Sequence, residues 1–343
     1  MTVLRAGAPI EAPRHVIGRR TTLVADPQRD GRLLGLDVWY PAVVGAYPAS
    51  VYELLPGVSF QAAAALHEAP VAPGSYPLIL FSHGRTGMRF AYSLLCEALA
   101  ARGAIVVSAD HPGDALADWL FGTFVDDRTN EMNRVGDAHA LLAGLLHGTA
   151  MLPRELLDAI DHDRVALAGH SYGAYTALAT AAGARGVPSH DRVGAIVCFQ
   201  PYTRTMSDGA LGRVAVPALL IVSELDATTP ATTDSDRPWA LIRGVPSWRL
   251  DLAGAAHQAA SDMGLYSEIA GQVPDLPDLV RQYLEYTAAD AVGPGLRPWR
   301  ELLAVQVRAA WAFLEIALGL DPAAGEAEAA RLATEPGLTL QRR

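Results

Sequence analysis

Residues Gly169-His170-Ser171-Tyr172-Gly173 stand between two runs of different pattern. The preceding run, residues 164–168, is short and apolar and is typical of a buried strand, whereas residues 174–182 have the composition of a helix. The glycines on either side of the serine allow the chain to turn sharply from strand to helix. This turn would leave the hydroxyl of Ser171 exposed at the tip of the strand, so this serine is a candidate nucleophile.

Short apolar runs alternate with helical patterns over most of the chain, which predicts an α/β fold with a parallel sheet covered on both faces. The first two strands, joined by the turn-like Asp30-Gly31, are expected to pair antiparallel at the edge of the sheet. Residues 43–75, rich in Ala, Pro and Gly, are expected to be irregular. We predict helices at residues 92–102, 131–146, 172–182 and 299–318. We expect a mostly parallel, eight-stranded sheet with strands at residues 21–25, 34–40, 78–82, 104–109, 165–168, 195–199, 218–223 and 248–252.

The composition limits the function classes. The 343 residues carry a formal net charge of -10, so there is no basic surface for nucleic acid. No apolar run approaches the roughly 20 residues that span a bilayer, and residues 1–10 lack the apolar stretch of a secretory signal. We therefore expect a cytoplasmic protein without integral membrane association. Cys96 and Cys198 lie in apolar segments and are expected to be buried free thiols.

A serine nucleophile needs a general base, usually a histidine that a carboxylate holds in the correct tautomer. The apolar run 217–223 predicts a buried strand, and Asp226 follows it in a turn. Glu224 is the rival carboxylate. His257 comes in the loop after the next predicted strand, where it would reach Ser171. Among the other histidines, His83 and His111 are expected near the pocket, and His170 is expected to point away from the nucleophile.

An acyl-transfer site also needs backbone amides that stabilise a developing oxyanion. The residue after the candidate nucleophile, Tyr172, would supply one amide. The predicted strand at residues 78–82 ends in His83-Gly84-Arg85, where Gly84 permits a turn and the amide of Arg85 would be the second donor. The other interpretation of His83-Gly84 is a simple turn at the end of a strand.

With these residues in place, the chain resembles the α/β-hydrolase superfamily, and within it the group of platelet-activating-factor acetylhydrolases and dienelactone-hydrolase-like esterases. The resemblance spans about residues 17–262, and the region at about 263–343 is expected to be helical within one domain, 1–343. It implies Ser171, Asp226 and His257 as a triad and no metal or cofactor. The segments that carry it are LDVWYP (36–41), GSYPLILFSHG (74–84), SADHPG (108–113), DRVALAGHSYG (163–173), residues 217–226 and GAAH (254–257).

The chain departs from this family pattern at three points. Arg85 stands where an apolar residue is common, and its guanidinium either favours an acidic substrate or turns outward to solvent. Ala174 replaces a frequent glycine. Ser171 stands where true dienelactone hydrolases have cysteine, which weakens any transfer of their substrate.

The segment at residues 115–127 is predicted either to line the substrate pocket or to pack internally. Trp119 and Phe121, together with Gly84, are therefore candidate substrate contacts. Arg134 and Asp137 have the spacing of a surface ion pair on a helix.

These patterns predict a serine hydrolase for a small-molecule carboxylic ester. A lactonase, a thioesterase, an amidase and a phospholipid acyl hydrolase share the same acyl-serine chemistry and stay open as alternatives. A non-catalytic binding protein of the same fold is a further alternative, although such relatives usually lose a triad member.

Overall fold

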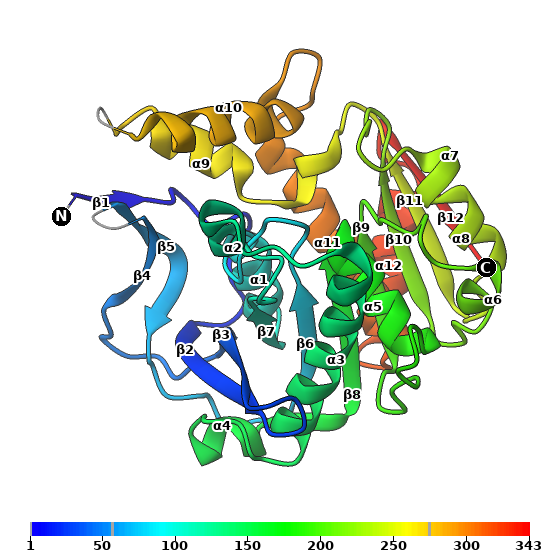
Figure 1. The fold of residues 1–343 in the computed structure, drawn as a ribbon, viewed down its shortest axis with the longest axis horizontal. Helices are drawn as coiled ribbons and strands as arrows, with labels where there is room; N and C mark the ends of the chain where they lie inside the picture. The colour runs from blue at the N-terminus through cyan, green and yellow to red at the C-terminus, as the bar shows by residue number, and fades with distance from the viewer. Residues whose placement is uncertain (1, 56–57, 274–275) are drawn as a thin grey trace.

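The computed structural model describes residues 2–55, 58–273 and 276–343. One large, twisted sheet runs through the molecule, and helices lie on both of its faces (Figure 1). The strands are β1 Thr2–Arg5, β2 Ile17–Asp26, β3 Arg32–Pro41, β4 Ala49–Leu55, β5 Val58–His67, β6 Tyr76–Ser82, β7 Ile105–Ala109, β8 Ile160–His170, β9 Ala195–Phe199, β10 Ala218–Ser223, β11 Ser247–Leu252 and β12 Leu338–Arg342.

The helices alternate with these strands, as the sequence pattern predicts. They are α1 Ser93–Ala101, α2 Leu116–Phe121, α3 Asp127–Leu146, α4 Arg154–Asp158, α5 Tyr172–Ala182, α6 Asp208–Leu211, α7 Ala231–Asp234, α8 Asp236–Leu241, α9 Met263–Ala270, α10 Asp278–Val292, α11 Trp299–Ala317 and α12 Pro322–Leu332, with a 3₁₀ turn at His257–Ala260.

The spatial order of the sheet is β1-β5-β2-β3-β7-β6-β8-β9-β10-β11-β12, with β4 paired to β5. The central strands from β7 to β11 are parallel. Their side chains alternate between two apolar cores, because successive residues of a strand point to opposite faces. In β6, for example, Ile79 and Phe81 belong to the core under α1 and α11, whereas Leu78 and Leu80 belong to the core under α3 and α5.

The predicted α/β fold and its mostly parallel sheet are confirmed, but the eight predicted strands are too few. Within the described residues the sheet has twelve strands. The prediction that residues 43–75 are irregular is wrong, because β4 and β5 occupy most of that stretch, although Pro56 and Gly57 lie outside the described residues. The pair β2–β3 is antiparallel, as expected, but it does not form the edge, since β5 and β1 continue the sheet beyond β2.

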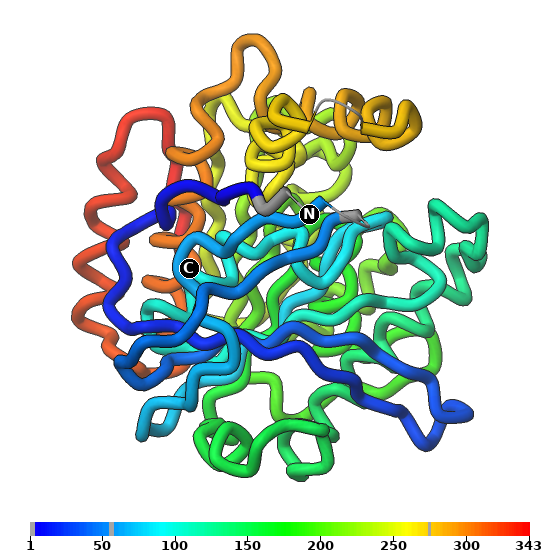
Figure 2. The backbone as a smooth tube through the Cα atoms, turned by 90° about the vertical axis from the view of Figure 1, so that its left-hand side faces the viewer, coloured from blue at the N-terminus to red at the C-terminus, as the bar shows by residue number. Residues whose placement is uncertain are grey.

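The C-terminal region is not purely helical. After α11 and α12, the chain ends in β12, which pairs antiparallel with β11 and so forms one border of the sheet. Because one sheet includes β1 and β12, we propose that residues 1–343 form a single domain. Figure 2 shows the four C-terminal helices from the side: α9 and α10 cross one end of the molecule, and α11 and α12 run alongside the sheet.

Two smaller predictions can be compared with the structure directly. Cys96 and Cys198 are both buried free thiols, as predicted. Among the described residues, no helix is long and apolar enough to span a bilayer.

Candidate active site

Ser171 lies between the end of β8 and the start of α5, in a backbone conformation that residues other than glycine rarely adopt. Its φ is 54° and its ψ is -117°. The flanking glycines are needed for a different reason from the one the sequence suggests, because neither has a positive φ. A Cβ on Gly173 would lie 1.9 Å from the carbonyl oxygen of Ser82, and one on Gly169 would lie 2.3 Å from Gly173. The glycines therefore allow α5 to pack directly against β8 and the end of β6.

The side chains of Ser171, His257 and Asp226 form one connected chain of hydrogen bonds. The distance from Ser171 Oγ to His257 Nε2 is 3.0 Å, and that from His257 Nδ1 to Asp226 Oδ2 is 2.8 Å. Because an ionised carboxylate only accepts, Nδ1 carries the proton and Nε2 presents its lone pair to the serine hydroxyl. All three residues are buried. This is the geometry in which a histidine can take the proton of a serine hydroxyl.

Asp226 is held in place by its own turn. Its Oδ1 accepts hydrogen bonds from the amides of Thr228 and Thr229, at 2.9 and 2.7 Å. The hydroxyl of Thr229 donates to Oδ2 at 2.7 Å. Burial raises the pKa of Asp226, but the hydrogen bonds and charge of His257 and the bonds from Thr229 outweigh burial, so the pKa lies below its usual value. The carboxylate form is therefore favoured.

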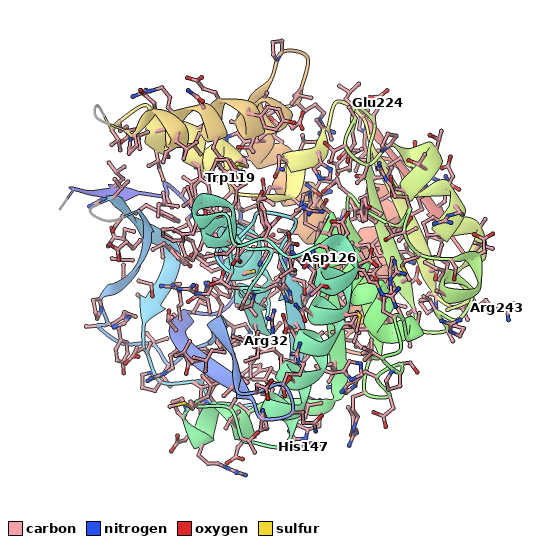
Figure 3. The ribbon with its side chains drawn as sticks, viewed as in Figure 1. Arg32, Trp119, Asp126, His147, Glu224 and Arg243 are labelled. Carbon is pink, nitrogen blue, oxygen red and sulfur yellow. The ribbon has the colours of Figure 1, made fainter. Side chains whose placement is uncertain are left out.

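The rival carboxylate, Glu224, lies apart from this chain. Its side chain is exposed and accepts a hydrogen bond from the amide of Gly254 at 2.9 Å. Figure 3 shows Glu224 at the outer end of its loop. Thr229 was not singled out in the sequence, and only its position three residues after Asp226 could have indicated a supporting role.

His170 has a position that sequence reasoning did not foresee. Its Nε2 lies 2.6 Å from the backbone oxygen of His257, and its Nδ1 lies 2.8 Å from the hydroxyl of Tyr92. Because a carbonyl only accepts, Nε2 must carry the proton, and Nδ1 accepts from Tyr92. Burial, with a smaller contribution from the nearby His257, lowers the pKa of His170 to about 3. His170 is therefore neutral, and it ties the backbone of His257 to α1.

In the loop after β6, the amides on either side of Arg85 have acceptors. The amide of Gly84 donates to the Tyr92 hydroxyl at 3.2 Å, that of Thr86 to the Asp114 carbonyl at 3.2 Å, and that of Gly87 to the Gly84 carbonyl at 3.1 Å. Among the described residues, no acceptor takes the amide of Arg85, and none takes the amide of Tyr172 at the start of α5. These are the two amides that the sequence predicts as oxyanion donors.

Behind this loop lies a buried ionic network, which corrects one prediction. Arg134 and Asp137 are fully buried and do not pair with each other. The guanidinium of Arg134 pairs with Asp114 at 2.8 Å and donates to the carbonyl of His83 at 2.8 Å. Because it also reaches the carbonyl of Gly84 at 3.3 Å, Arg134 fixes the backbone on both sides of the turn. Helical spacing alone could not reveal that this face of α3 is turned inward.

His83 and His111 support the same loop and do not face Ser171. The Nδ1 of His83 lies 2.6 Å from the Gly84 carbonyl, and its Nε2 accepts from the His111 amide at 3.1 Å. His111 contacts Asp137 through Nδ1 at 3.0 Å. Burial, reinforced by the positive charge of Arg134, lowers the pKa of both histidines. Both are therefore neutral structural groups.

The side chain of Arg85 is partly exposed and engaged in ion pairs. Its guanidinium lies 2.6 Å from Asp127 and 3.7 Å from Asp114. It also lies over the ring of Tyr172, 5.7 Å from the ring centroid. Of the two predicted orientations, the structure shows the outward one, with two carboxylates already neutralising the charge.

A cavity of about 800 Å³, counting its open side, contains Ser171 and His257. Gly84 and Arg85 line it, as expected, and α10 contributes a wall that the sequence did not predict. The α10 residues are Tyr283, Tyr286, Thr287 and Asp290.

The predicted pocket residues Trp119 and Phe121 are not among the residues that line this cavity. Phe121 is 80% exposed, and Trp119 packs against Tyr283 with the ring centroids 5.1 Å apart. Figure 3 shows Trp119 beneath α9 and α10. The structure therefore places Trp119 behind the wall of the cavity and Phe121 outside it, and the contact of either residue with substrate stays a prediction.

No group of three or more metal-ligating side chains occurs within the described ranges. The hydrogen bonds that join Ser171, His257 and Asp226 suit these groups to proton transfer and nucleophilic attack.

The parallel sheet, the serine at the turn after β8 and the order Ser171, Asp226, His257 along the chain define an α/β-hydrolase fold. A known structure shares it: a ferulic acid esterase from Streptomyces cinnamoneus superposes with a TM-score of 0.70 over 98% of this chain and 99% of that chain, at 23% identity.

Within this superfamily the chain is similar to serine esterases. The chlorophyllase family model matches residues 56–209. The chain is 27% identical to the platelet-activating factor acetylhydrolase of Bos taurus and 25% identical to that of Canis lupus familiaris, over 43% of this chain in each case. The match covers 40% of the length of each of these two relatives.

Proposed function

We propose that this chain is a serine hydrolase that cleaves small carboxylic esters through an acyl-serine intermediate. The observation that carries the proposal is the continuous hydrogen-bond chain from Ser171 through His257 to Asp226, with 3.0 and 2.8 Å links, beside two amides without acceptors. The similarity to platelet-activating factor acetylhydrolases and to a ferulic acid esterase supports ester hydrolysis as the reaction class.

In the proposed first step, Ser171 Oγ attacks the ester carbonyl while His257 Nε2 takes the hydroxyl proton. Asp226 stabilises the imidazolium that forms and keeps its orientation. The carbonyl oxygen becomes an oxyanion, and the amides of Arg85 and Tyr172 donate to it. The carbon–oxygen bond to the alcohol then breaks, and His257 gives its proton to the leaving alkoxide.

In the second step, water attacks the acyl-serine. His257 accepts one proton of the water, and the same two amides stabilise the second oxyanion. The bond to Ser171 Oγ breaks, His257 returns the proton to the serine, and the carboxylic acid leaves. The two steps together convert one ester and one water into an alcohol and a carboxylic acid, and they return Ser171 and His257 to their starting protonation states.

The test is the hydrolysis of p-nitrophenyl acetate and p-nitrophenyl octanoate by the wild type and by Ser171→Ala. We expect turnover of at least one ester by the wild type and a fall in kcat of up to about a million-fold in the variant, the scale on which other enzymes lose activity without their triad serine. Circular dichroism shows whether the variant is folded. A folded variant with less than about tenfold loss, far below that scale, would exclude Ser171 as the nucleophile.

A second candidate function is acyl hydrolysis of phospholipids, because bulky exposed side chains on α10, which lines the cavity, and in and after α2, which packs against α10, form an apolar rim beside the cavity. Phe121 is 80% exposed and Tyr286 is 84% exposed, and Leu120 and Phe124 are exposed nearby. Such a rim is expected of an enzyme that works at a lipid surface. The test compares phosphatidylcholine vesicles with dispersed p-nitrophenyl acetate in the wild type and in Phe121→Ser. If the enzyme works at a lipid surface, Phe121→Ser should lower the rate on vesicles but not the rate on p-nitrophenyl acetate. If the variant and the wild type have equal rates on each substrate, small dissolved esters are favoured as the substrates.

A further inference from the structure

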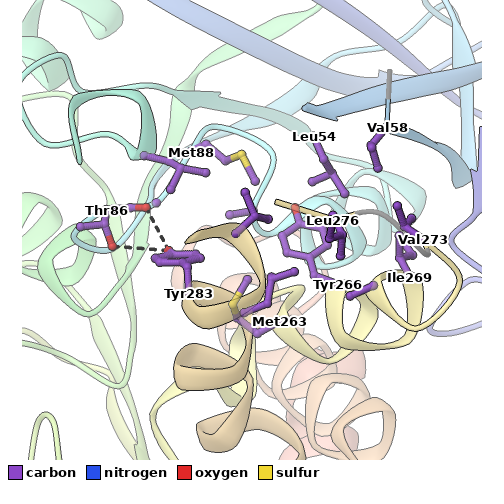
Figure 4. Close-up of a pocket in the computed structure, with 16 residues that line it drawn as sticks. Leu54, Val58, Thr86, Met88, Met263, Tyr266, Ile269, Val273, Leu276 and Tyr283 are labelled. Atoms are coloured by element: carbon purple, nitrogen blue, oxygen red, sulfur yellow. Dashed lines mark hydrogen bonds between the residues drawn. The ribbon is translucent and has the colours of Figure 1, made fainter. Parts of the chain in front are cut away.

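A second cavity, of about 630 Å³ counting its open side, adjoins the one that holds Ser171. It lies between the β4–β5 strands and the helices α9 and α10 (Figure 4). Its lining side chains are almost all aliphatic or aromatic, and none is charged. Leu54, Met263, Ile269 and Val280 are examples.

The few hydroxyls at this cavity are already engaged in hydrogen bonds. The hydroxyl of Tyr266 donates to the Phe90 carbonyl at 3.1 Å, and that of Tyr283 donates to the Thr86 carbonyl at 3.3 Å. A polar ligand would therefore lose its hydration without gaining partners, whereas an apolar group would gain contacts on every side.

The cavity is open on one side, so a ligand can reach its apolar walls. Apolar surface gains free energy when another apolar group covers it and removes it from water. A pocket with this lining therefore suits an apolar group.

The second cavity lies directly beside the catalytic one. Five residues line both of them: Thr86, Gly87, Ala91, Met263 and Tyr283. Tyr283 stands at the boundary, where its hydroxyl contacts Thr86 and its ring packs against Trp119 at 5.1 Å. Figure 4 shows the contact of Tyr283 with Thr86 at one side of the cavity and the side chains of Val58, Ile269 and Val273 at the other.

We propose that this second cavity binds the apolar chain of the ester whose carbonyl Ser171 attacks. The proposal rests on the esterase function proposed above and names the substrate class: esters with an extended hydrocarbon or similarly apolar chain. The chain would leave the reacting carbonyl, pass between Met263 and Tyr283, and lie against α9 and α10. Either side of the ester, acyl or alkoxy, supplies such a chain, and two substrate series distinguish the two sources.

The experiment measures kcat/KM for p-nitrophenyl acetate, butyrate and octanoate, and for methyl, butyl and octyl acetates. Each methylene that enters the cavity should raise kcat/KM roughly fourfold, which is about 0.8 kcal/mol per buried CH₂ at about 1.4 kcal/mol per tenfold. The series that shows the increase identifies the side of the ester that enters.

A matched pair of variants tests the location. Val280 lines the cavity, whereas its neighbour Leu279 is 51% exposed on the same helix. Val280→Trp fills the cavity and should abolish the increase of kcat/KM with chain length. Leu279→Trp introduces the same side chain on the outer face and should behave as the wild type. If Val280→Trp does not fold, Val280→Phe provides a smaller block.

The possible failures are distinguishable. If the acetates are hydrolysed but kcat/KM is flat in both series, or if Val280→Trp retains the increase, the esterase proposal stands and the cavity proposal is overturned. If the wild type hydrolyses no ester in either series, the proposed function is overturned, and the cavity proposal with it.

Discussion

His170 and His257 are joined by a hydrogen bond that makes the residue before the candidate nucleophile a support for the candidate base. The donor is His170 Nε2 and the acceptor is the backbone oxygen of His257, 2.6 Å away. On the other side of the ring, Tyr92 donates to Nδ1 and accepts from the Gly84 amide. The serine turn, the histidine loop and the loop after β6 are thus connected through one imidazole.

This relationship predicts that His170→Phe impairs catalysis without removing a reacting group. The phenyl ring keeps the bulk, but the His257 carbonyl loses its donor and Tyr92 loses its acceptor. We expect kcat to fall roughly tenfold to a hundredfold, the effect of small misplacements of reacting groups, with KM nearly unchanged. Steady-state kinetics on a p-nitrophenyl ester measures both constants. A purely structural role would lower the melting temperature and leave kcat as in the wild type.

The choice between the two carboxylates after β10 is tested by a pair of conservative changes. Asp226→Asn removes the charge that orients His257, and kcat should fall by up to about 10⁴-fold, as when a triad aspartate is lost elsewhere. Glu224→Gln changes an exposed side chain that only accepts from Gly254, and kcat should stay near the wild-type value. Larger damage from Glu224→Gln would show that the acid is assigned to the wrong residue.

Gly173→Ala should destabilise the fold, because its Cβ would lie 1.9 Å from the Ser82 carbonyl oxygen in β6. The atoms that this Cβ would meet are backbone atoms and cannot move aside as a flexible side chain would. The loss in free energy of unfolding should therefore exceed about 3 kcal/mol, the upper end of the usual range for overpacking. Urea denaturation measures this loss. Gly209→Ala is the matched control, because the atom that its added Cβ would meet beyond its own helix backbone, within the part of the chain that the structure describes, is the end of the Arg213 side chain at 4.0 Å.

The pKa of His170 predicts a specific pH dependence of stability. The value is about 3 in the folded protein, against an ordinary value of 6.5. Below 6.5 the unfolded chain takes up a proton that the folded protein does not, so this group lowers the free energy of unfolding as the pH falls from 6.5 towards 3. The slope approaches about 1.4 kcal/mol per pH unit. In His170→Phe this contribution is missing. The difference in free energy of unfolding between the variant and the wild type, measured by urea denaturation, should therefore change steadily between pH 6.5 and 3.

Asp262 should have the opposite effect. Burial, which outweighs the hydrogen bonds from Ser93 and Leu94, raises its pKa from 3.8 to about 7. Between these values the folded protein keeps a proton that the unfolded chain has lost, so this group stabilises the fold as the pH falls from 7 towards 4. Urea denaturation at several pH values gives the difference in free energy of unfolding between the wild type and Asp262→Asn. This difference should change with pH in the direction opposite to that of the difference for His170→Phe. Trends of the same sign would contradict both assignments.

The sequence was sufficient for the central strands because their side chains are buried on both faces, which leaves continuous apolar runs. It failed at β5, where Gln61-Ala62-Ala63-Ala64-Ala65 contains no β-branched or aromatic residue. This segment is a strand because β1, β2 and β4 pair with it. Pairing partners that are distant in the chain are not visible in local composition.

The three residues of the proposed triad could be picked out from the sequence because each follows a recognisable strand, and strand order fixes where they meet. The residues that hold this site in place through hydrogen bonds could not be predicted in the same way. His170, Thr229 and Arg134 act through hydrogen bonds whose partners are 87, 3 and 51 residues away along the chain. The wall formed by α10 was missed because its tyrosines are unremarkable as a local pattern. Their role depends on where the helix crosses the end of the sheet.

The pairing of β12 with β11 has a consequence for how the protein is made. Backbone bonds between Ser247 and Arg343, and from Ala253 to Gly337, join the end of the chain to the strand that precedes the His257 loop. Synthesis proceeds from the N-terminus, so β11 is complete at Leu252 while its partner β12 begins only at Leu338. An open strand edge invites pairing with other chains. The outer edge of β11 is therefore open to neighbouring chains while the residues between these two strands are made.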